Sequence, residues 1–509
     1  MLVLDSIYIY VYVPKQSQAV YYEVQQVDDT PERKQWPNQQ KNENNVEHKP
    51  PPGLKSLIDH LVSVYPDQPN PLQVTTLLKY WLGGSDPLDY ISMYSNNGQG
   101  EGDSERVPPH WHYVSFGLSD LHGDQRVHLK EEHTTRSGMG FELTFRLAKT
   151  PAELKQQSES PEKPLRPPTW PANLLQSIAR YCFQTGNGLC FGDNIPWRKS
   201  LDGSATSRMN SLLVAQDPQL GCIETPFGTV DFCQIVGVTE EELEQASRWN
   251  GRGVLNFLAK DVQTGGDWMV TNMDRTMSVF ELFPETLLNL QDDLEKQGSD
   301  LAGVNAEFAF RELKQTKTIK EDVDFKCLNE RCASEENNRP LTESQVKREE
   351  PSFPQSMSLS SNSLHKSCPL DNQPQAPDCI SLDGIEITMA PYAAKYLLLA
   401  IKDRIRHGRH FTFKAQHLAL TLVSETVTGA AVTVSEPFGV LGYWIQVLIP
   451  DDLVSRMMEA FRNAQLDGKT EPTQRLEFDW PDKNFKLIVD QPTICPLPTA
   501  MSIETPNIN

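Results

Sequence analysis

GFELTFRL, residues Gly140–Leu147, alternates apolar and polar side chains without a break, and its apolar members are Phe141, Leu143, Phe145 and Leu147. Successive side chains of a strand point to opposite faces of a sheet, so this pattern predicts a strand that is half-buried, with one apolar face and one polar face. The apolar face requires a second layer to cover it, and the neighbouring segments must supply that layer.

Helical patterns follow on the C-terminal side of this strand. In WPANLLQSIARYCF (Trp170–Phe183) the apolar residues recur at helical spacing behind a proline in the first turn. In TEEELEQASRW (Thr239–Trp249), Thr239 is the predicted N-cap and three glutamates follow it, where the helix dipole favours negative charge. TPFGTVDFCQIVGV (Thr225–Val238), between the two, has the composition of a strand region. This mixture of strands and helices predicts an α/β (mixed α+β) domain.

The composition changes abruptly after this domain. Residues 312–378 contain no Trp or Tyr and are rich in Ser, Glu, Gln and Asn, so they cannot offset their conformational entropy by burial. Strand patterns resume with ISLDGIEITMA (Ile380–Ala390), which begins a second, smaller mixed domain. The predicted boundaries are a disordered leader at 1–52, a first domain at 53–300, the start of the second domain at 301–311, a disordered linker at 312–378, the rest of the second domain at 379–492 and a disordered tail at 493–509.

The charge and cysteine content narrow the classes of function. A formal net charge of −21 and a pI near 5.0 argue against direct nucleic-acid binding, which needs a basic face. The nine cysteines form no C-x-x-C pair, so neither a zinc ribbon nor a disulfide framework is predicted. The apolar start MLVLDSIYIYVYV (Met1–Val13) is too short for a membrane span, contains Asp5 and alternates like a strand. We therefore expect an intracellular protein without a membrane anchor or a cofactor.

Histidines gather in HWHYVSFGLSDLHGD (His110–Asp124), which contains His110, His112 and His122. His110 and His112 would share one face of a strand, so a metal-dependent enzyme that uses these three imidazoles is one hypothesis. The alternative is that they are structural, because a lone H-x-H is a weak signal. The sequence contains neither a G-x-x-x-x-G-K-[ST] loop nor an H-E-x-x-H motif, so no further motif supports an enzyme.

Longer blocks of the sequence resemble one known family. YPDQPNPLQVTTLLKYWLGGSDPLDYISMY (Tyr65–Tyr94), ETPFGTVDFCQIVGVTEEEL (Glu224–Leu243) and HGRHFTFK (His407–Lys414) are similar to segments of the Suppressor of fused family. The resemblance runs from Gly53 to about Val489 and leaves out the linker. It implies a non-enzymatic negative regulator of Hedgehog signalling that restrains its partner in the cytoplasm and suppresses it in the nucleus.

The resemblance also implies a two-domain clamp, in which each domain is a mixed sheet packed with helices. The partner would be a zinc-finger transcription factor of the Gli/Cubitus interruptus class, bound through a short S-Y-G-H-L motif that lies as a strand between the domains. A strand added to a sheet edge gains main-chain hydrogen bonds, and alternate side chains enter pockets. A Fused-type kinase and other Hedgehog components are further implied partners. The alternative is a general signalling scaffold that acts through the disordered linker.

The family resemblance assigns peptide-binding residues in the first domain. CFGDNIPW (Cys190–Trp197) resembles the strand at the family's cleft, with Leu189 just before it and Trp197 at its end. Asp193 stands where the family places the carboxylate that meets the histidine of the motif, although by itself it also suits a turn aspartate beside a glycine. Tyr181 resembles an aromatic residue that shapes the cleft, although its helical spacing equally suits the core.

In the second domain, YAAKYLLLAIKDRIRHGR (Tyr392–Arg409) resembles the partner strand of the cleft. Tyr396 or Leu397 aligns with an apolar cleft residue of the family, and Arg404 would lie at the rim. A basic run of this kind is otherwise a solvated face.

Overall fold

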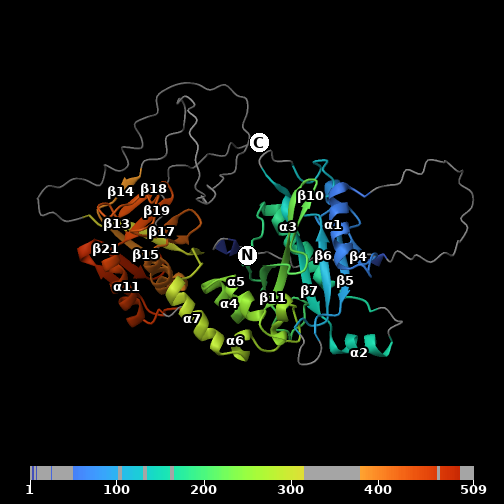
Figure 1. Cartoon of the computed structure of the whole chain (residues 1–509). Coiled ribbons are helices and arrows are strands. Elements are labelled where there is room, and N and C mark those ends of the chain that lie inside the picture. Colours follow the sequence, from blue (N-terminus) through green and yellow to red (C-terminus); the bar gives the residue numbers. More distant parts are fainter. Residues whose placement is uncertain are drawn as a thin grey trace, which may run out of the picture.

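The computed structural model describes residues 50–100, 106–129, 134–160, 165–314, 379–466 and 471–492, together with the backbone of three two-residue strands nearer the N-terminus. The chain forms two lobes, which Figure 1 shows side by side, the N-lobe in blue to yellow-green and the C-lobe in yellow to red. Most of the predicted leader, the predicted linker from residue 315 onward and the predicted tail lie outside the described residues.

The N-lobe is built on one mixed sheet with the strand order β2-β1-β8-β9-β11-β7-β6-β5-β4-β3, with β10 attached to β11. The strands are β1 (Val3–Leu4), β2 (Ile7–Tyr8), β3 (Val24–Gln25), β4 (Leu72–Thr75), β5 (Tyr90–Asn96), β6 (His110–Phe116), β7 (Arg136–Ala148), β8 (Asn194–Ile195), β9 (Ser211–Gln216), β10 (Cys222–Thr225) and β11 (Gly228–Val238). Central strand β7 is parallel to β11 and antiparallel to β6. The mixed class predicted from the sequence is confirmed, while three short strands of the expected leader, β1 to β3, join the sheet.

Helices cover both faces of this sheet. They are α1 (Pro52–Val64), α2 (Pro151–Glu159), α3 (Trp170–Thr185), α4 (Glu240–Arg248), α5 (Gly251–Leu258), α6 (Val279–Leu282) and α7 (Glu285–Gln297), with 3₁₀ turns η1 (Tyr80–Leu82), η3 (Val262–Thr264) and η4 (Gly266–Trp268). Ile235 of β11 packs with α3, whereas its neighbour Val236 packs with α4 to α7, so these helices lie on opposite faces. The predicted cap of α4 is confirmed, because Thr239 and Glu242 form a reciprocal capping box.

Strand β7 is buried on both faces, so the prediction of a half-buried strand was wrong. Its apolar residues pack with α3, and its polar residues Glu142, Thr144 and Arg146 are also 0% exposed. The reason is the second helical layer, which removes solvent from a face that the sequence pattern marks as polar. Each buried polar group must then find a partner inside the protein.

Arg146 finds its partners in a buried network. Its guanidinium lies 2.8 Å from Asp217, donates to Gln234 at 3.0 Å and lies 2.8 Å from the His110 ring. Burial opposes the ionisation of Asp217, but Arg146 and His112 outweigh it and hold the pKa of the carboxyl well below its usual range. This pair is therefore a charged pair in the interior, fully supported by hydrogen bonds.

The two imidazoles of β6 belong to the same network. His112 lies 3.0 Å from Asp217 through Nε2 and 2.8 Å from the Tyr65 hydroxyl through Nδ1. His110 contacts Arg146 and, through Nδ1, the carbonyl of Pro108 at 2.8 Å. Burial, with Arg146 nearby, lowers the pKa of His112 to about 4, so this ring is neutral at pH 7.

The C-lobe contains two smaller mixed sheets around one core, with the strand orders β12-β16-β17-β19-β18-β14 and β13-β15-β21-β20. The strands are β12 (Gly303–Asn305), β13 (Phe308–Glu312), β14 (Ile380–Ser381), β15 (Ile385–Met389), β16 (Phe411–Lys414), β17 (Ala419–Ser424), β18 (Phe438–Leu441), β19 (Trp444–Ile449), β20 (Leu476–Trp480) and β21 (Phe485–Val489). Strand β13 ends at Glu312, which pairs with Ile385, so the second domain continues past the predicted linker boundary.

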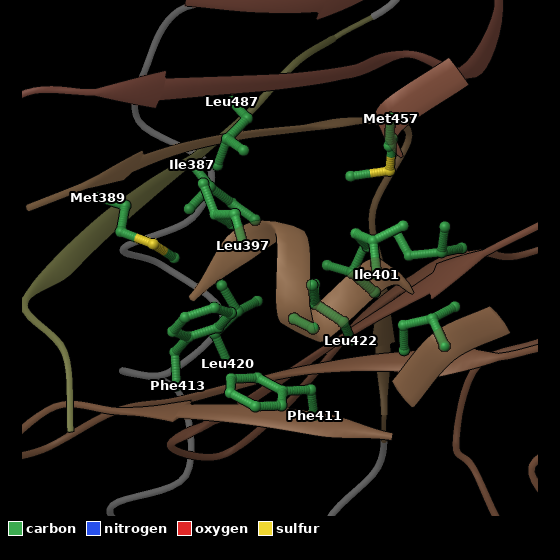
Figure 2. Packing of buried hydrophobic residues seen from close by; sticks show 14 of the residues in the cluster. Ile387, Met389, Leu397, Ile401, Phe411, Phe413, Leu420, Leu422, Met457 and Leu487 are labelled. Carbon is green, nitrogen blue, oxygen red and sulfur yellow. The ribbon is translucent and has the colours of Figure 1, made fainter. Parts of the chain in front are cut away.

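Helical segments complete the C-lobe: α9 (Pro391–Ala394), α10 (Leu397–Leu399), the π-helical turn η5 (Ala400–Arg404), η6 (Ile405–His407), α11 (Asp451–Asn463) and η7 (Pro481–Lys483). Residues 392–407, which resemble a cleft strand, are thus mainly helical, and the expected strand was wrong. The Ala- and Leu-rich run favours a helix, and its apolar face enters the core. Figure 2 shows Leu397 and Ile401 among the side chains of the surrounding strands. Within the described parts of the chain, no helix combines the length and apolar character needed to cross a membrane.

The buried histidines predict a pH dependence of stability. The pKa of His112 is about 4 in the folded state against an ordinary 6.5, so the unfolded chain takes up the proton first as the pH falls. The stabilisation is fully present above about pH 6.5 and is lost toward pH 4, at about 1.4 kcal/mol per pH unit for one proton. His112→Gln, which stays neutral, should reduce this slope in urea unfolding measured from pH 7 to 4.5.

The exposed His417→Gln serves as the matched control, and its slope should equal that of the wild type. An identical slope in His112→Gln would mean that His112 does not titrate between the two states in this range.

Candidate functional site between the lobes

A cavity of about 630 Å³ lies where the two lobes meet. Its lining comes from residues 190–194, 246–247 and 249–252 of the N-lobe, from residues 300–302 between the lobes, and from His410 of the C-lobe. The cavity has a mixed lining, in which apolar residues such as Phe191, Trp249 and Leu301 alternate with carboxylates, amides, an arginine and an imidazole. Such a place suits a ligand that carries many hydrogen-bonding groups, as an extended peptide does.

Strand β8 lies next to this cavity. It pairs with β9 on one side, through Asn194↔Leu213 and Ile195↔Leu212, and with the two-residue strand β1 on the other. The carbonyl of Asp193 accepts a hydrogen bond from Val214 of β9, so by the alternation of strand hydrogen bonds Asn194 presents its main-chain groups on the other side. Residue Val3 of β1 pairs with Asn194 there.

The C-lobe contributes a sheet edge at the same place. Strand β12 pairs with β16 on one side, in parallel and with the register Gly303↔Thr412, and it ends the six-stranded sheet. The residues just before β12, Asp300 to Ala302, line the cavity. The sequence reasoning missed this strand, because three residues that include Gly and Asn give almost no strand signal.

The turn that precedes β8 is held by α5. Gly192 has φ +100°, and a Cβ on Gly251 at the start of α5 would lie 2.1 Å from the carbonyl oxygen of Gly192. Only glycine permits this approach. Arg252 Nε donates to the carbonyl of Phe191 at 3.0 Å and fixes the same turn from its other end.

Asp193 is the one predicted peptide-binding residue that lines the interlobe cavity. One of its carboxylate oxygens accepts a hydrogen bond of 2.7 Å from the backbone N–H of Cys190, so it is also a turn aspartate. Its neighbour Asn194, which the sequence reasoning did not single out, has a buried side-chain oxygen that finds no hydrogen-bond partner among the described residues. A donor on a ligand in the cavity would satisfy that oxygen.

The other predicted residues of the N-lobe lie elsewhere. Tyr181 and Leu189 are buried in the core that β7 shares with α3, and the Tyr181 hydroxyl accepts a hydrogen bond from Asn187 at 2.9 Å. Trp197 is half-buried beside that core and lines a different hollow with Trp170. The core interpretation that the spacing of Tyr181 allowed is therefore the one that the structure supports.

The predicted residues of the C-lobe are likewise not on a cleft strand. Leu397 is 1% exposed in the C-lobe core, and Tyr396 packs partly buried against it. Arg404 is not a solvated rim residue, because it is 7% exposed and donates to the backbone carbonyls of Ser299 and His410.

The three histidines of the predicted cluster lie in two different places. His110 and His112 are engaged in the Arg146 network, whereas His122 lies 3.9 Å from Asp89 beside a different, small hollow. Across the described ranges, no group of three or more His, Cys, Asp or Glu residues is placed to hold a metal ion. The geometry thus separates the three imidazoles that the enzyme hypothesis combines.

Comparisons with known proteins agree with this two-lobed organisation. A family model described as "Suppressor of fused protein (SUFU)" matches residues 84–276, and one described as "Suppressor of Fused Gli/Ci N terminal binding domain" matches residues 288–489. The Suppressor of fused homolog of Mus musculus is 38% identical over 461 residues, which cover 86% of this chain and 91% of the mouse protein. The Homo sapiens homolog is 37% identical, with the same coverage.

Solved structures match as well. A crystal structure of Drosophila Suppressor of Fused is 78% identical and covers 87% of this chain and 98% of its own, with a TM-score of 0.74. A chain of a Sufu–Fu complex is 82% identical and covers 48% of this chain and 100% of its own, with a TM-score of 0.47.

The fold and the cavity define a two-lobed α+β protein in which each lobe has its own core and contributes residues beside a short strand, β8 or β12, to a shared cavity. The chain belongs to the Suppressor of fused family, which is a family of regulatory proteins.

The position of Leu397 predicts a stability effect. Leu397→Ala should lower the free energy of unfolding by about 2–5 kcal/mol, because it leaves a cavity among packed side chains. Val434→Ala in the same lobe, at a side chain that is 65% exposed, should change it by less than about 0.5 kcal/mol. Urea denaturation of both variants measures the difference. Equal stabilities would place Leu397 outside the core.

Proposed function

We propose that this protein is a non-enzymatic negative regulator of Hedgehog signalling that binds transcription factors of the Gli/Cubitus interruptus class. It clamps the S-Y-G-H-L motif of the factor as an extended strand between β8 of the N-lobe and β12 of the C-lobe. In the cytoplasm the clamp sequesters the factor, and in the nucleus it suppresses it.

The observation that carries this proposal is that β8 of the N-lobe and the start of β12 of the C-lobe lie beside one cavity. Neighbouring strands lie about 4.8 Å apart, so one bound strand between two edges can satisfy both sides of its backbone. Five residues span only about 17 Å, so pairing with a single edge would give few hydrogen bonds. Val3 of β1 pairs with Asn194 on this side of β8, so this side accepts an added strand, and in the proposal the peptide takes the place of β1 there.

The partner class is supported by the name of the second family model, a Gli/Ci binding domain, which matches the C-lobe and α7. A Fused-type kinase partner stays a prediction from the family resemblance. The scaffold alternative relies on the linker, whose residues from 315 to 378 lie outside the described part of the chain.

Asp193 supplies the specific charge in this proposal. Its carboxylate lines the cavity and would accept a hydrogen bond from the protonated histidine of the motif. A hydrogen bond to a charged group contributes roughly 1.5–3 kcal/mol, and shielding between two lobes keeps it from being screened. The unpartnered oxygen of Asn194 gives the bound strand a second acceptor on the adjacent residue.

Replacing Asp193 tests the assignment of the charge. Asp193→Asn keeps an oxygen for the Cys190 N–H but loses the charge, so it should weaken peptide binding by about 10- to 150-fold with little change in melting temperature. Asp193→Arg should abolish binding. Titration calorimetry with an S-Y-G-H-L peptide measures both. Asp202→Asn, at another turn aspartate that lies outside the cavity, is the control and should bind like the wild type.

A scan of N-methylated peptides tests the two-edge geometry. Methylation removes one backbone donor at a time. Along a strand, successive N–H groups point to opposite sides, so a peptide on one edge is sensitive at alternate residues only. A peptide held between β8 and β12 should lose affinity at every methylated position. An alternating pattern would reject the clamp and leave a single-edge binder.

A further inference from the structure

The chain passes from the N-lobe to the C-lobe through Gly298, Ser299 and Asp300, which we call the junction. Ser299 is 0% exposed and uses its hydroxyl, its N–H and its carbonyl oxygen at once. Few residues in a connecting segment are this completely bonded, because connections usually run over the surface. The junction is therefore an ordered, buried segment whose position is fixed by hydrogen bonds.

The junction is bonded to the N-lobe at the end of α4. The Ser299 hydroxyl donates to the carbonyl of Arg248, and the N–H of Asp300 donates to the carbonyl of Trp249 at 2.8 Å. Trp249 is followed by Asn250 and Gly251, and Gly251 packs against the Gly192 turn in front of β8. A short path of direct contacts thus links the junction to the β8 edge.

The junction is bonded equally to the C-lobe. The N–H of Ser299 donates to the carbonyl of Asp403 at 2.8 Å, and its own carbonyl accepts from both Arg404 and Arg409 at 2.8 Å. A Cβ on Gly298 would lie 2.3 Å from the Asp403 carbonyl oxygen, so the two segments are in close contact. Strand β12 starts just beyond the junction, at Gly303.

Arg404 is unusual among these groups. It is 7% exposed, and the hydrogen bonds of its guanidinium go to the backbone carbonyls of Ser299 and His410. Burial, together with Arg409, lowers its pKa to about 10. The carboxylate of Asp300 offsets part of this effect. Burying a cation is nevertheless costly, and an apolar side chain of similar volume would often be as stable. A planar guanidinium, however, holds two carbonyls at a fixed separation, which an apolar side chain cannot do.

We infer that Ser299 and Arg404 form the hinge that fixes the separation of the β8 and β12 edges, and that both are positioning residues for strand capture. The inference rests on the proposed function and deepens it. Two edges that share one strand must lie roughly 9.6 Å apart, twice the strand spacing. Hydrogen bonds between N and O form over a window of only about 0.5 Å, so a small change at the hinge removes one edge from reach.

The experiment compares Arg404→Met and Ser299→Ala with the wild-type full chain. Small-angle scattering without peptide should give a more extended particle for both variants, because the lobes are no longer tied at Ser299. Calorimetry with the S-Y-G-H-L peptide should show binding weakened by about tenfold or more, because the peptide loses a few hydrogen bonds to one of the two strands. The N-methyl scan should change from sensitivity at every residue to sensitivity at alternate residues, since only one edge remains in register.

Arg456→Met is the matched control. Arg456 makes a bidentate pair with Asp482 inside the C-lobe and does not contact the junction, so its loss should leave scattering, affinity and scan pattern unchanged. Arg404→Lys keeps the cation but cannot reach both carbonyls, and it should behave like Arg404→Met. If Arg404→Met does not fold, Arg404→Lys and Ser299→Ala carry the comparison.

The outcomes separate the hinge from the proposed function. Wild-type scattering and an unchanged scan pattern in Ser299→Ala and the Arg404 variants would overturn the hinge. A wild-type chain that does not bind the peptide would reject the proposed function, and the scattering comparison would still decide whether Ser299 and Arg404 fix the lobes.

Discussion

A buried charge pair joins the central strands of the N-lobe. Arg146 and Asp217 meet in the interior, on a face of the sheet from which the helices exclude water, and each carries enough further hydrogen bonds to offset its desolvation. The pair ties β7 to the end of β9, and β9 is the strand on which β8 is built. The Arg146–Asp217 pair therefore helps to fix the position of β9 and, through β9, the position of β8.

A second buried charge lies between the lobes, and it is stabilised in a different way. Arg404 is also a buried cation, but its hydrogen bonds go to main-chain carbonyls rather than to a carboxylate. In the N-lobe the charge pair holds strands of one sheet together. At the junction the arginine holds two sheets in a fixed relation across a cavity, which is the arrangement that an extended ligand with free N–H and C=O groups requires. Well-packed apolar groups could supply comparable stability at these places. We therefore infer that Arg146, Asp217 and Arg404 serve mainly to fix the relative positions of the strands and lobes that they connect.

The sequence predicted the helices and strands better than it predicted whether their side chains face a core, a cleft or solvent. The helix after Trp170, the Thr239 cap and the strand character of residues 140–147 depend on local spacing and are present in the structure. The candidate site was harder, because Asp193 lines the cavity while Tyr181, Leu189 and Leu397 are buried in cores. An alignment of motifs gives the position of a residue along the chain, and it does not say whether its side chain faces a core or a cleft. The sequence of β12 does not predict a strand, because the strand is only three residues long and forms through its pairing with β16.

By itself the sequence determined the periodicities, the caps, the composition break after the first domain and the membership of a family, because these are properties of residues close together in the chain or of long matching blocks. Only the tertiary structure decided that the polar face of β7 is buried, that His110 and His112 contact a charge pair, and that Arg404 closes a junction at Ser299. Each of these depends on groups that lie tens of residues or more apart in the chain. The free energy of a buried polar group is set by such distant partners, and no local pattern records them.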